Sequence, residues 1–174
     1  MSVRGAVFMS CVLLSVLSGC ADLDRAKARH EDGMNRDSAV VDLLAVKADI
    51  KEWESSLAEL APPEFVDGVT QGPEMALLSC TERTYRLTGA TGVAIEQEFD
   101  VEGYFSAVET RFSSDADVET SRERSRWGDE RLIISREDGA VFSISHFPDS
   151  GKMHIASDSA CYLIDADQAP HGSV

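Results

Sequence analysis

The sequence predicts an α+β domain in which an antiparallel sheet of about four to five strands carries two helices on one face. Three observations support this fold class. Two segments, one long and one short, repeat apolar residues at spacings of three and four, and the C-terminal third alternates apolar and polar residues in three runs. Two cysteines, Cys80 and Cys161, are placed to join the first strand region to the end of the last one.

The first twenty residues have the features of an export signal that ends at a cysteine. Arg4 precedes an apolar run over residues 6–17, and residues 17–20, Leu-Ser-Gly-Cys, match a bacterial lipobox. We expect residues 1–19 to be a removed lipoprotein signal peptide and Cys20 to be the lipid attachment site. The protein would then be lipid-anchored at the extracytoplasmic face of the cell membrane. An ordinary secretory signal with a cysteine near its cleavage site is the alternative.

The formal net charge is −15, and removal of the leader makes it one unit more negative because Arg4 is lost and no acid is. Such a chain is repelled by nucleic-acid phosphates and by anionic lipid headgroups, so we expect no nucleic-acid partner. The acidity predicts a solvated surface. The alternative is that the acidic residues bind a basic partner or divalent cations.

The cysteine count favours one disulfide. Cys11 leaves with the leader and Cys20 takes the lipid, so Cys80 and Cys161 are the thiols left in an oxidising compartment. On the chain-entropy model, closing a loop of about 80 residues stabilises the fold by roughly 4 to 5 kcal/mol. A reactive or metal-binding pair would be spaced more closely and would have a histidine nearby in sequence.

The chain divides into four parts. After the leader, residues 20–36 are dense in charge and have no apolar period, which predicts a flexible tether. Residues 37–164 are expected to form a single domain, and residues 165–174 a loose C-terminal tail.

The domain is expected to open with a helix that ends at Pro62 and Pro63, with Asp37 as its N-cap. Its apolar stripe consists of Leu43, Val46, Ile50, Trp53, Leu57 and Leu60. Fewer than four heptads are present, so packing on a sheet is favoured over a coiled coil.

The middle of the domain is expected to contain one strand and the second helix. A loop with Gly68, Gly72 and Pro73 leads to an extended run over residues 75–87, and a turn over residues 89–92 follows. The apolar stripe of the second helix consists of Val101, Tyr104, Phe105, Val108 and Phe112.

Residues 130–164 predict a meander with a defined register. A three-residue loop over 137–139, with Gly139 left-handed, sets Ile134 opposite Phe142 and Leu132 opposite Ile144. A four-residue loop over 148–151 then sets the middle strand of the meander opposite the last strand. The resulting pairs are Ile144 with Ile155 and His146 with Met153. A one-residue slip would move a whole apolar set to solvent, so burial selects this register.

Two groups of residues resemble parts of metal sites. His146 and His154 would hold zinc only in a slipped register, because the favoured pairing puts them on opposite faces. Asp115, Asp117 and Glu119 resemble the start of a calcium loop but lack its glycine and its distal glutamate, so a solvated acidic loop is the prediction.

The layout resembles that of the small actinobacterial LppA-like lipoproteins. The similarity lies in residues 17–20, residues 78–80, Trp127-Gly128, Asp138-Gly139 and residues 159–162. It spans most of the chain after Cys20. It implies this fold and an envelope location, and no catalytic residues, because members of the family are largely of unknown function.

No catalytic, metal or cofactor motif stands out in the sequence, and we expect no enzyme activity and no cofactor. The function we expect is a non-enzymatic binding or accessory module of the cell envelope. Its partners would be the membrane, through Cys20, and an envelope protein, glycan or lipid. A hydrolase whose Asp, Glu and His converge from distant positions is one alternative, and a structural spacer is another.

Overall fold

The computed structural model describes residues 41–125 and 129–164, all within the unit that spans Arg36–Val174. The helices, with the two short 3₁₀ turns, are α2 (Leu43–Glu59), η1 (Pro63–Phe65), α3 (Val101–Phe112) and η2 (Pro148–Ser150). The strands are β1 (Val66–Gln71), β2 (Ala76–Ser79), β3 (Thr84–Ile95), β4 (Val118–Arg124), β5 (Glu130–Arg136), β6 (Val141–Phe147), β7 (Lys152–Asp158) and β8 (Tyr162–Leu163). The predicted α+β class is confirmed.

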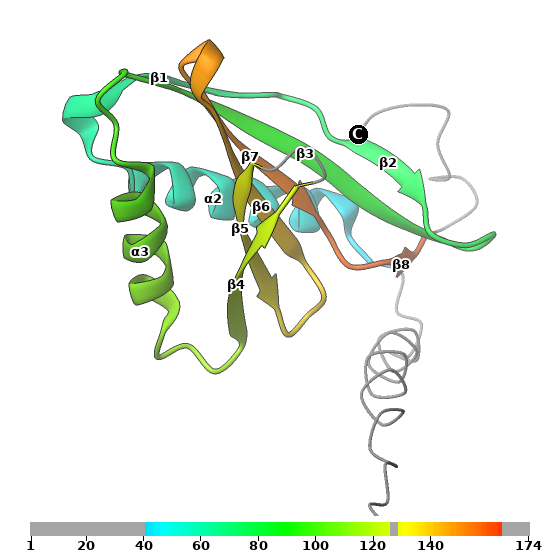
Figure 1. The fold of residues 1–174 in the computed structure, drawn as a ribbon. Coiled ribbons are helices and arrows are strands. Elements are labelled where there is room, and N and C mark those ends of the chain that lie inside the picture. The colour runs from blue at the N-terminus through cyan, green and yellow to red at the C-terminus, as the bar shows by residue number, and fades with distance from the viewer. Residues whose placement is uncertain (1–40, 126–128, 165–174) are drawn as a thin grey trace, which may run out of the picture. The chain divides into compact units, whose positions relative to one another are not determined.

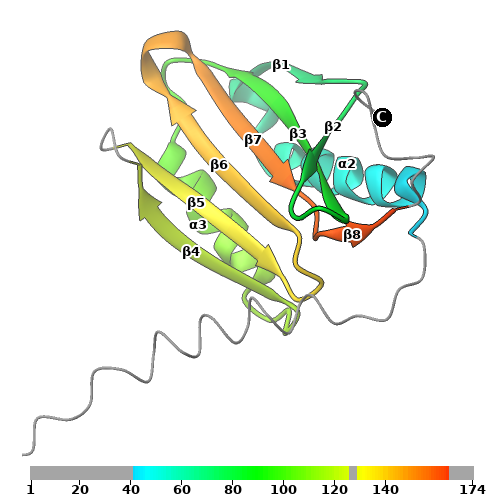
Figure 2. The ribbon, with the colours of Figure 1, turned by 90° about the vertical axis from the view of Figure 1, so that its right-hand side faces the viewer.

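The strands form one antiparallel sheet of eight strands in the order β1-β3-β7-β6-β5-β4, with β2 and β8 also paired to β3. Both helices lie against the same face of this sheet, as Figures 1 and 2 show. The predicted number of about four to five strands was therefore too low. None of the helices in the described ranges is long and apolar enough to span a membrane.

The core fills the space between the helices and the sheet. Its largest fully buried side chains include Ile50 and Leu57 from α2, Tyr104 and Phe105 from α3, and Phe142 from β6. The predicted stripes of both helices face this core, although four of their residues are only partly buried, namely Val46, Trp53, Leu60 and Val101. Each buried side chain of this size stabilises the fold by about 1.5 to 3 kcal/mol.

The meander has the predicted register. Ile134 pairs with Phe142, Leu132 with Ile144, and Ile144 with Ile155. Both loops form as expected, since Arg136 N–H donates to the carbonyl of Ala140 across the first, and Gly139 has φ of +93°. The second loop is η2 followed by Gly151, whose φ of +59° is also left-handed.

The start of the first helix was predicted wrongly. Asp42, not Asp37, is the N-cap, and its carboxylate accepts hydrogen bonds from the N–H groups of Leu44 and Ala45. A side-chain cap satisfies donors that the first helical turn leaves free. Asp37 itself lies outside the described residues.

The middle of the domain was also predicted incorrectly in three places. The run over residues 75–87 is split by a bend at residues 80–83 into β2 and β3, so Cys80 lies at a hairpin end rather than inside a strand. Gly89 and Gly92 belong to β3 and form no turn. Gly68 lies in β1 rather than in a loop.

Candidate functional site

A mainly apolar hollow lies between the C-terminal half of α2 and the edge strand β1. Its volume is about 420 Å³. We call it the edge hollow and define it by its lining residues, which are Ser55, Ala58, Glu59, Ala61, Pro63, Val66 and Val69. It is the candidate site because a concave apolar surface with a few polar groups at its rim is the usual form of a binding site.

The local sequence explains why the space stays open. The prolines at 62 and 63 end α2 and turn the chain through η1 into β1. Ala58 and Ala61 present only methyl groups where larger side chains would fill the gap. Val69, on the far wall, keeps 51% of its surface exposed, which is unusual for a valine on the helix-covered face of a sheet.

The strand that borders the hollow has one free edge. Among the strands that the structure describes, β1 pairs with β3 alone. The register shifts between Val66 and Gly68, and the remainder, Gly68–Gln71, pairs regularly with β3. Backbone N–H and C=O groups along the outer side of such a strand can accept a further strand.

The opposite edge of the sheet is different. Strand β4 has charged side chains at four of its seven positions, namely Glu119, Arg122, Glu123 and Arg124. Charged residues on an edge strand discourage pairing with another chain. Between Gly68 and Gln71, β1 has no charged residue at all.

The chain around the edge hollow is acidic. Residues 52–82 contain seven Asp and Glu residues and no Lys, Arg or His. Of these acids, Glu59, Glu64, Asp67 and Glu74 are exposed and lie in or beside the segments that form the hollow and β1. The hollow therefore combines an apolar wall, a free strand edge and a negative rim.

Trp53 lines two smaller hollows, each of about 320 Å³. The Trp53 ring stacks on Phe112 of α3 and on Phe142 of β6, with centroids 5.2 and 5.4 Å apart. The guanidinium of Arg136 lies 4.9 Å from the Trp53 centroid and forms ion pairs with Asp49 and Asp138. The chain's own arginine thus occupies the cation position over this aromatic ring.

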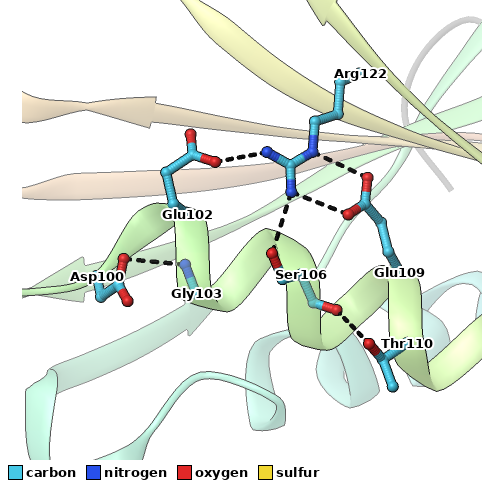
Figure 3. Close-up of polar contacts among 7 residues, drawn as sticks. All are labelled: Asp100, Glu102, Gly103, Ser106, Glu109, Thr110 and Arg122. Carbon is cyan, nitrogen blue, oxygen red and sulfur yellow. Dashed lines mark hydrogen bonds and ion pairs between the residues drawn. The ribbon is translucent and has the colours of Figure 1, made fainter.

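A polar cluster joins α3 to β4. Arg122 donates to both oxygens of Glu109, at 2.9 Å each, and to Glu102 at 2.6 Å, and Ser106 completes its contacts (Figure 3). The hydrogen bonds from Arg122 lower the pKa of Glu109 and outweigh the effect of partial burial. Every charged side chain of the cluster is paired within it, so the cluster holds helix α3 on strand β4.

The buried carboxylate of Glu54 is also internally paired. It is 1% exposed and accepts hydrogen bonds from Gln71 Nε2 at 3.0 Å, Thr91 Oγ1 at 2.8 Å and Ser157 Oγ. Three neutral donors from three strands thus compensate one buried carboxylate. Glu54 lines none of the three hollows described above. We therefore assign it a role in the stability of the core.

The predicted disulfide is present. Cys80 and Cys161 are bonded and close a loop over a sequence separation of 81 residues. The predicted lipid attachment site, Cys20, lies outside the described residues, as do the leader, the tether, the tail and Trp127.

The structure separates the two histidines of the zinc hypothesis. His146 pairs with Met153 on the helix-covered face, whereas His154 pairs with Ser145 and faces away from the helices. His154 instead contacts the Phe147 ring edge-on, with centroids 5.5 Å apart. Burial lowers the pKa of His146.

The acidic segment is partly as predicted. Asp115 and Asp117 are exposed in the turn after α3, but Glu119 belongs to β4. Within residues 41–125 and 129–164, no group of three or more His, Cys, Asp and Glu is arranged to hold a metal ion.

The edge hollow was not foreseen from the sequence. Its walls come from two elements whose contact depends on the fold, and the sequence predicts a loop where β1 lies. The available signal was the long stretch without a basic residue, residues 52–82, in which Phe65, Val66 and Val69 are the apolar residues between Pro63 and Pro73.

No protein-family model matches the sequence, and no curated protein matches it. Among solved structures, the fold is similar to that of a DUF4853 family protein from Actinomyces odontolyticus, with 13% sequence identity and a TM-score of 0.44. The similarity covers 74% of this chain and 72% of that one. At this level it carries no statement about function, and the resemblance to LppA-like lipoproteins stays a prediction.

Proposed function

We propose that the protein is a lipid-anchored binding module of the cell envelope that holds a partner in the edge hollow. The observation that carries the proposal is the coincidence of an apolar hollow of about 420 Å³ with a free strand edge. Val69 and the outer edge of β1 are exposed to solvent, and an exposed apolar surface beside an unpaired strand edge is typical of an interaction site.

Two independent features support the proposed location of the protein. The lipobox that ends at Cys20 provides a site for lipid attachment, and two acyl chains suffice for stable anchoring. The Cys80–Cys161 bond fits a compartment where disulfides persist. The expected location is the extracytoplasmic face of the membrane.

The absence of enzyme activity is part of the same proposal. A dispersed hydrolytic site would bring a histidine and carboxylates together in one cleft. His146 and His154 face opposite sides of the sheet, and the linings of the three described hollows contain neither histidine. Glu102 and Glu109 are paired with Arg122, and Asp49 and Asp138 are paired with Arg136.

The binding role is tested by site-specific photocrosslinking in living cells. A photoreactive amino acid replaces Val69 in the full-length chain, and a control chain carries it at Ser121, an exposed position on the opposite edge strand. The proposal expects a discrete adduct from position 69 and none from position 121. No adduct at 69, or the same adducts at both positions, would contradict it.

The anchor is tested separately with Cys20→Ser. This variant should keep its leader or appear in the soluble fraction, whereas the unchanged chain should partition with membranes and have the mass of a diacylated N-terminus. A native protein that lacks the lipid would overturn the anchor and leave the crosslinking result standing on its own.

A further inference from the structure

We infer that the edge hollow binds an extended, basic segment of another polypeptide, which adds to the sheet as a strand beside β1. This inference rests on the proposed binding function and names the chemistry of its partner. Recognition would combine main-chain hydrogen bonds to β1, one apolar side chain in the hollow and basic side chains against the acidic rim.

The backbone of β1 supplies the first part of the recognition. In an antiparallel pair, alternate residues direct their N–H and C=O groups away from the partner strand. Strand β3 holds one side of Gly68–Gln71, so the outward groups of this stretch can form a second ladder. The shift between Val66 and Gly68 marks where regular pairing would stop.

The register of an added strand places its side chains. The residue opposite Val69 would lie on the same face as Val69, over the hollow lined by Ala58, Ala61 and Pro63. Its two neighbours would lie on the other face, beside Gly68 and Thr70. A Cβ placed on Gly68 would meet no atom within 4 Å, so that face has room for them.

The charge of the surroundings selects a basic partner. Residues 52–82 contain no basic residue, and the ammonium of the nearby Lys51 donates to the carbonyl of Gly72 at the end of β1. Glu59, Glu64 and Asp67 are exposed in or next to the segments that line the hollow. Two copies of this chain joined edge to edge through β1 would bring these acids together. Anionic lipid headgroups would be repelled for the same reason.

The inference is tested with synthetic peptides and the full chain purified in detergent. The probe is a fluorescent octapeptide with one central leucine, threonines beside it and lysines at alternate outer positions. A second peptide has glutamate for lysine, and a third keeps the lysines but has N-methyl groups on alternate backbone nitrogens. Binding is followed by fluorescence anisotropy at low ionic strength, where charge attraction is least screened.

Two charge-matched variants separate strand addition from general attraction. Val69→Lys and Ser121→Lys each add one positive charge to an exposed position of an edge strand. Strand addition at β1 expects Val69→Lys to weaken binding of the lysine peptide at least about tenfold, equivalent to about 1.4 kcal/mol, and Ser121→Lys to change it little. The glutamate and N-methylated peptides should bind at least as weakly as the lysine peptide binds to Val69→Lys.

Amide exchange provides a readout that needs no variant. Addition of the lysine peptide should slow exchange in residues 68–71 and leave β4 unchanged. Equal loss of binding in both variants, or equal binding of the N-methylated peptide, would overturn strand addition. An adduct from position 69 to a second copy of the chain or to lipid would also overturn it.

The two proposals fail in different ways. If position 69 forms an adduct with a polypeptide in cells but the peptides show no preference, the binding function stands and the extended basic segment does not. If position 69 forms no adduct, both are wrong.

Discussion

The carboxylate of Glu54 on α2 accepts a hydrogen bond from Ser157 on β7, although 103 residues separate them in sequence. Thr91 on β3 and Gln71 on β1 donate to the same carboxylate, so one side chain of the helix connects to three neighbouring strands. The backbone reinforces this contact, because Gln71 Nε2 also donates to the carbonyl of Lys51 on α2. The residues of α2 that line the edge hollow, Ser55, Ala58 and Glu59, follow directly after Glu54, so these hydrogen bonds connect the same part of α2 to β1.

Glu54→Ala should destabilise the fold strongly. The change would leave the hydroxyls of Thr91 and Ser157 without their acceptor, would remove one of the two hydrogen bonds of Gln71 Nε2 and would open a cavity. Each unsatisfied buried polar group costs about 1 to 3 kcal/mol. We expect a loss of about 3 to 5 kcal/mol in the free energy of unfolding, measured with urea. Glu54→Gln keeps the shape and one acceptor oxygen, so its loss should be about half as large. A smaller loss for Ala than for Gln would contradict the assignment.

Removal of the disulfide should have an effect of similar size. The bond closes a loop with a sequence separation of 81 residues, for which the chain-entropy model gives about 4 to 5 kcal/mol. The double variant Cys80→Ser, Cys161→Ser should unfold at correspondingly lower denaturant concentration. Adding a reductant should destabilise the unchanged protein and leave the double variant unaffected, which provides the control.

The meander could be predicted because its apolar residues alternate with period two and its loops contain glycine. Leu132, Ile134, Phe142 and Ile144 are all fully buried on one face, and a slip would expose them. Gly139 and Gly151 have the left-handed backbone that short loops require. Local pattern and tertiary burial agree in this part of the chain.

The turn predicted over residues 89–92 is absent because Gly89 allows close packing within strand β3. A Cβ at Gly89 would approach Met75 Cε to 3.0 Å and Glu54 Oε1 to 3.2 Å. The residue is therefore glycine where the helix carboxylate and a core methionine come closest to the strand. Contacts with residues 14 and 35 positions away leave no trace in the local sequence.

The strands at the two edges were missed for a different reason. In β1, positions 67–70 are all exposed, so no apolar alternation marks the strand. In β4, Val118, Thr120 and Arg122 face the helices, and the last of these is satisfied by Glu102 and Glu109 of α3. The candidate site could not be predicted for the same reason, because it is built against an edge strand.

Arg122→Met should lower stability in a manner that depends on pH. The arginine lowers the pKa of Glu109, so the carboxylate stabilises the fold fully above its unfolded pKa of about 4.3, and this contribution is lost as pH falls through the lower folded value. We expect a loss of about 1 kcal/mol at pH 7, since partly exposed ion pairs contribute about 0.2 to 1 kcal/mol each.

The control for this prediction is Arg131→Met, which removes a more exposed ion pair to Glu123 on the opposite face of the sheet. Urea midpoints at pH 7 and pH 3 would be compared for both variants. The deficit of Arg122→Met should be smaller at pH 3 than at pH 7, because the contribution of the ion pair declines once pH falls below the unfolded pKa of about 4.3 and toward the lowered pKa of Glu109. A deficit that stays constant with pH would show that packing of Arg122 over Phe105, and not its charge, accounts for the loss.

His146 should make the protein less stable in mildly acidic solution. Burial lowers its pKa below the ordinary value of about 6.5, so the neutral imidazole is the form that fits the folded state. The unfolded chain binds the proton first as pH falls, and stability should decline from about pH 6.5 down through the folded pKa. The variant His146→Gln has no such group, so the decline between pH 7 and 5 should be smaller in it. A direct check is the imidazole titration followed by NMR, in which a midpoint at or above 6.5 would show that burial does not govern this side chain.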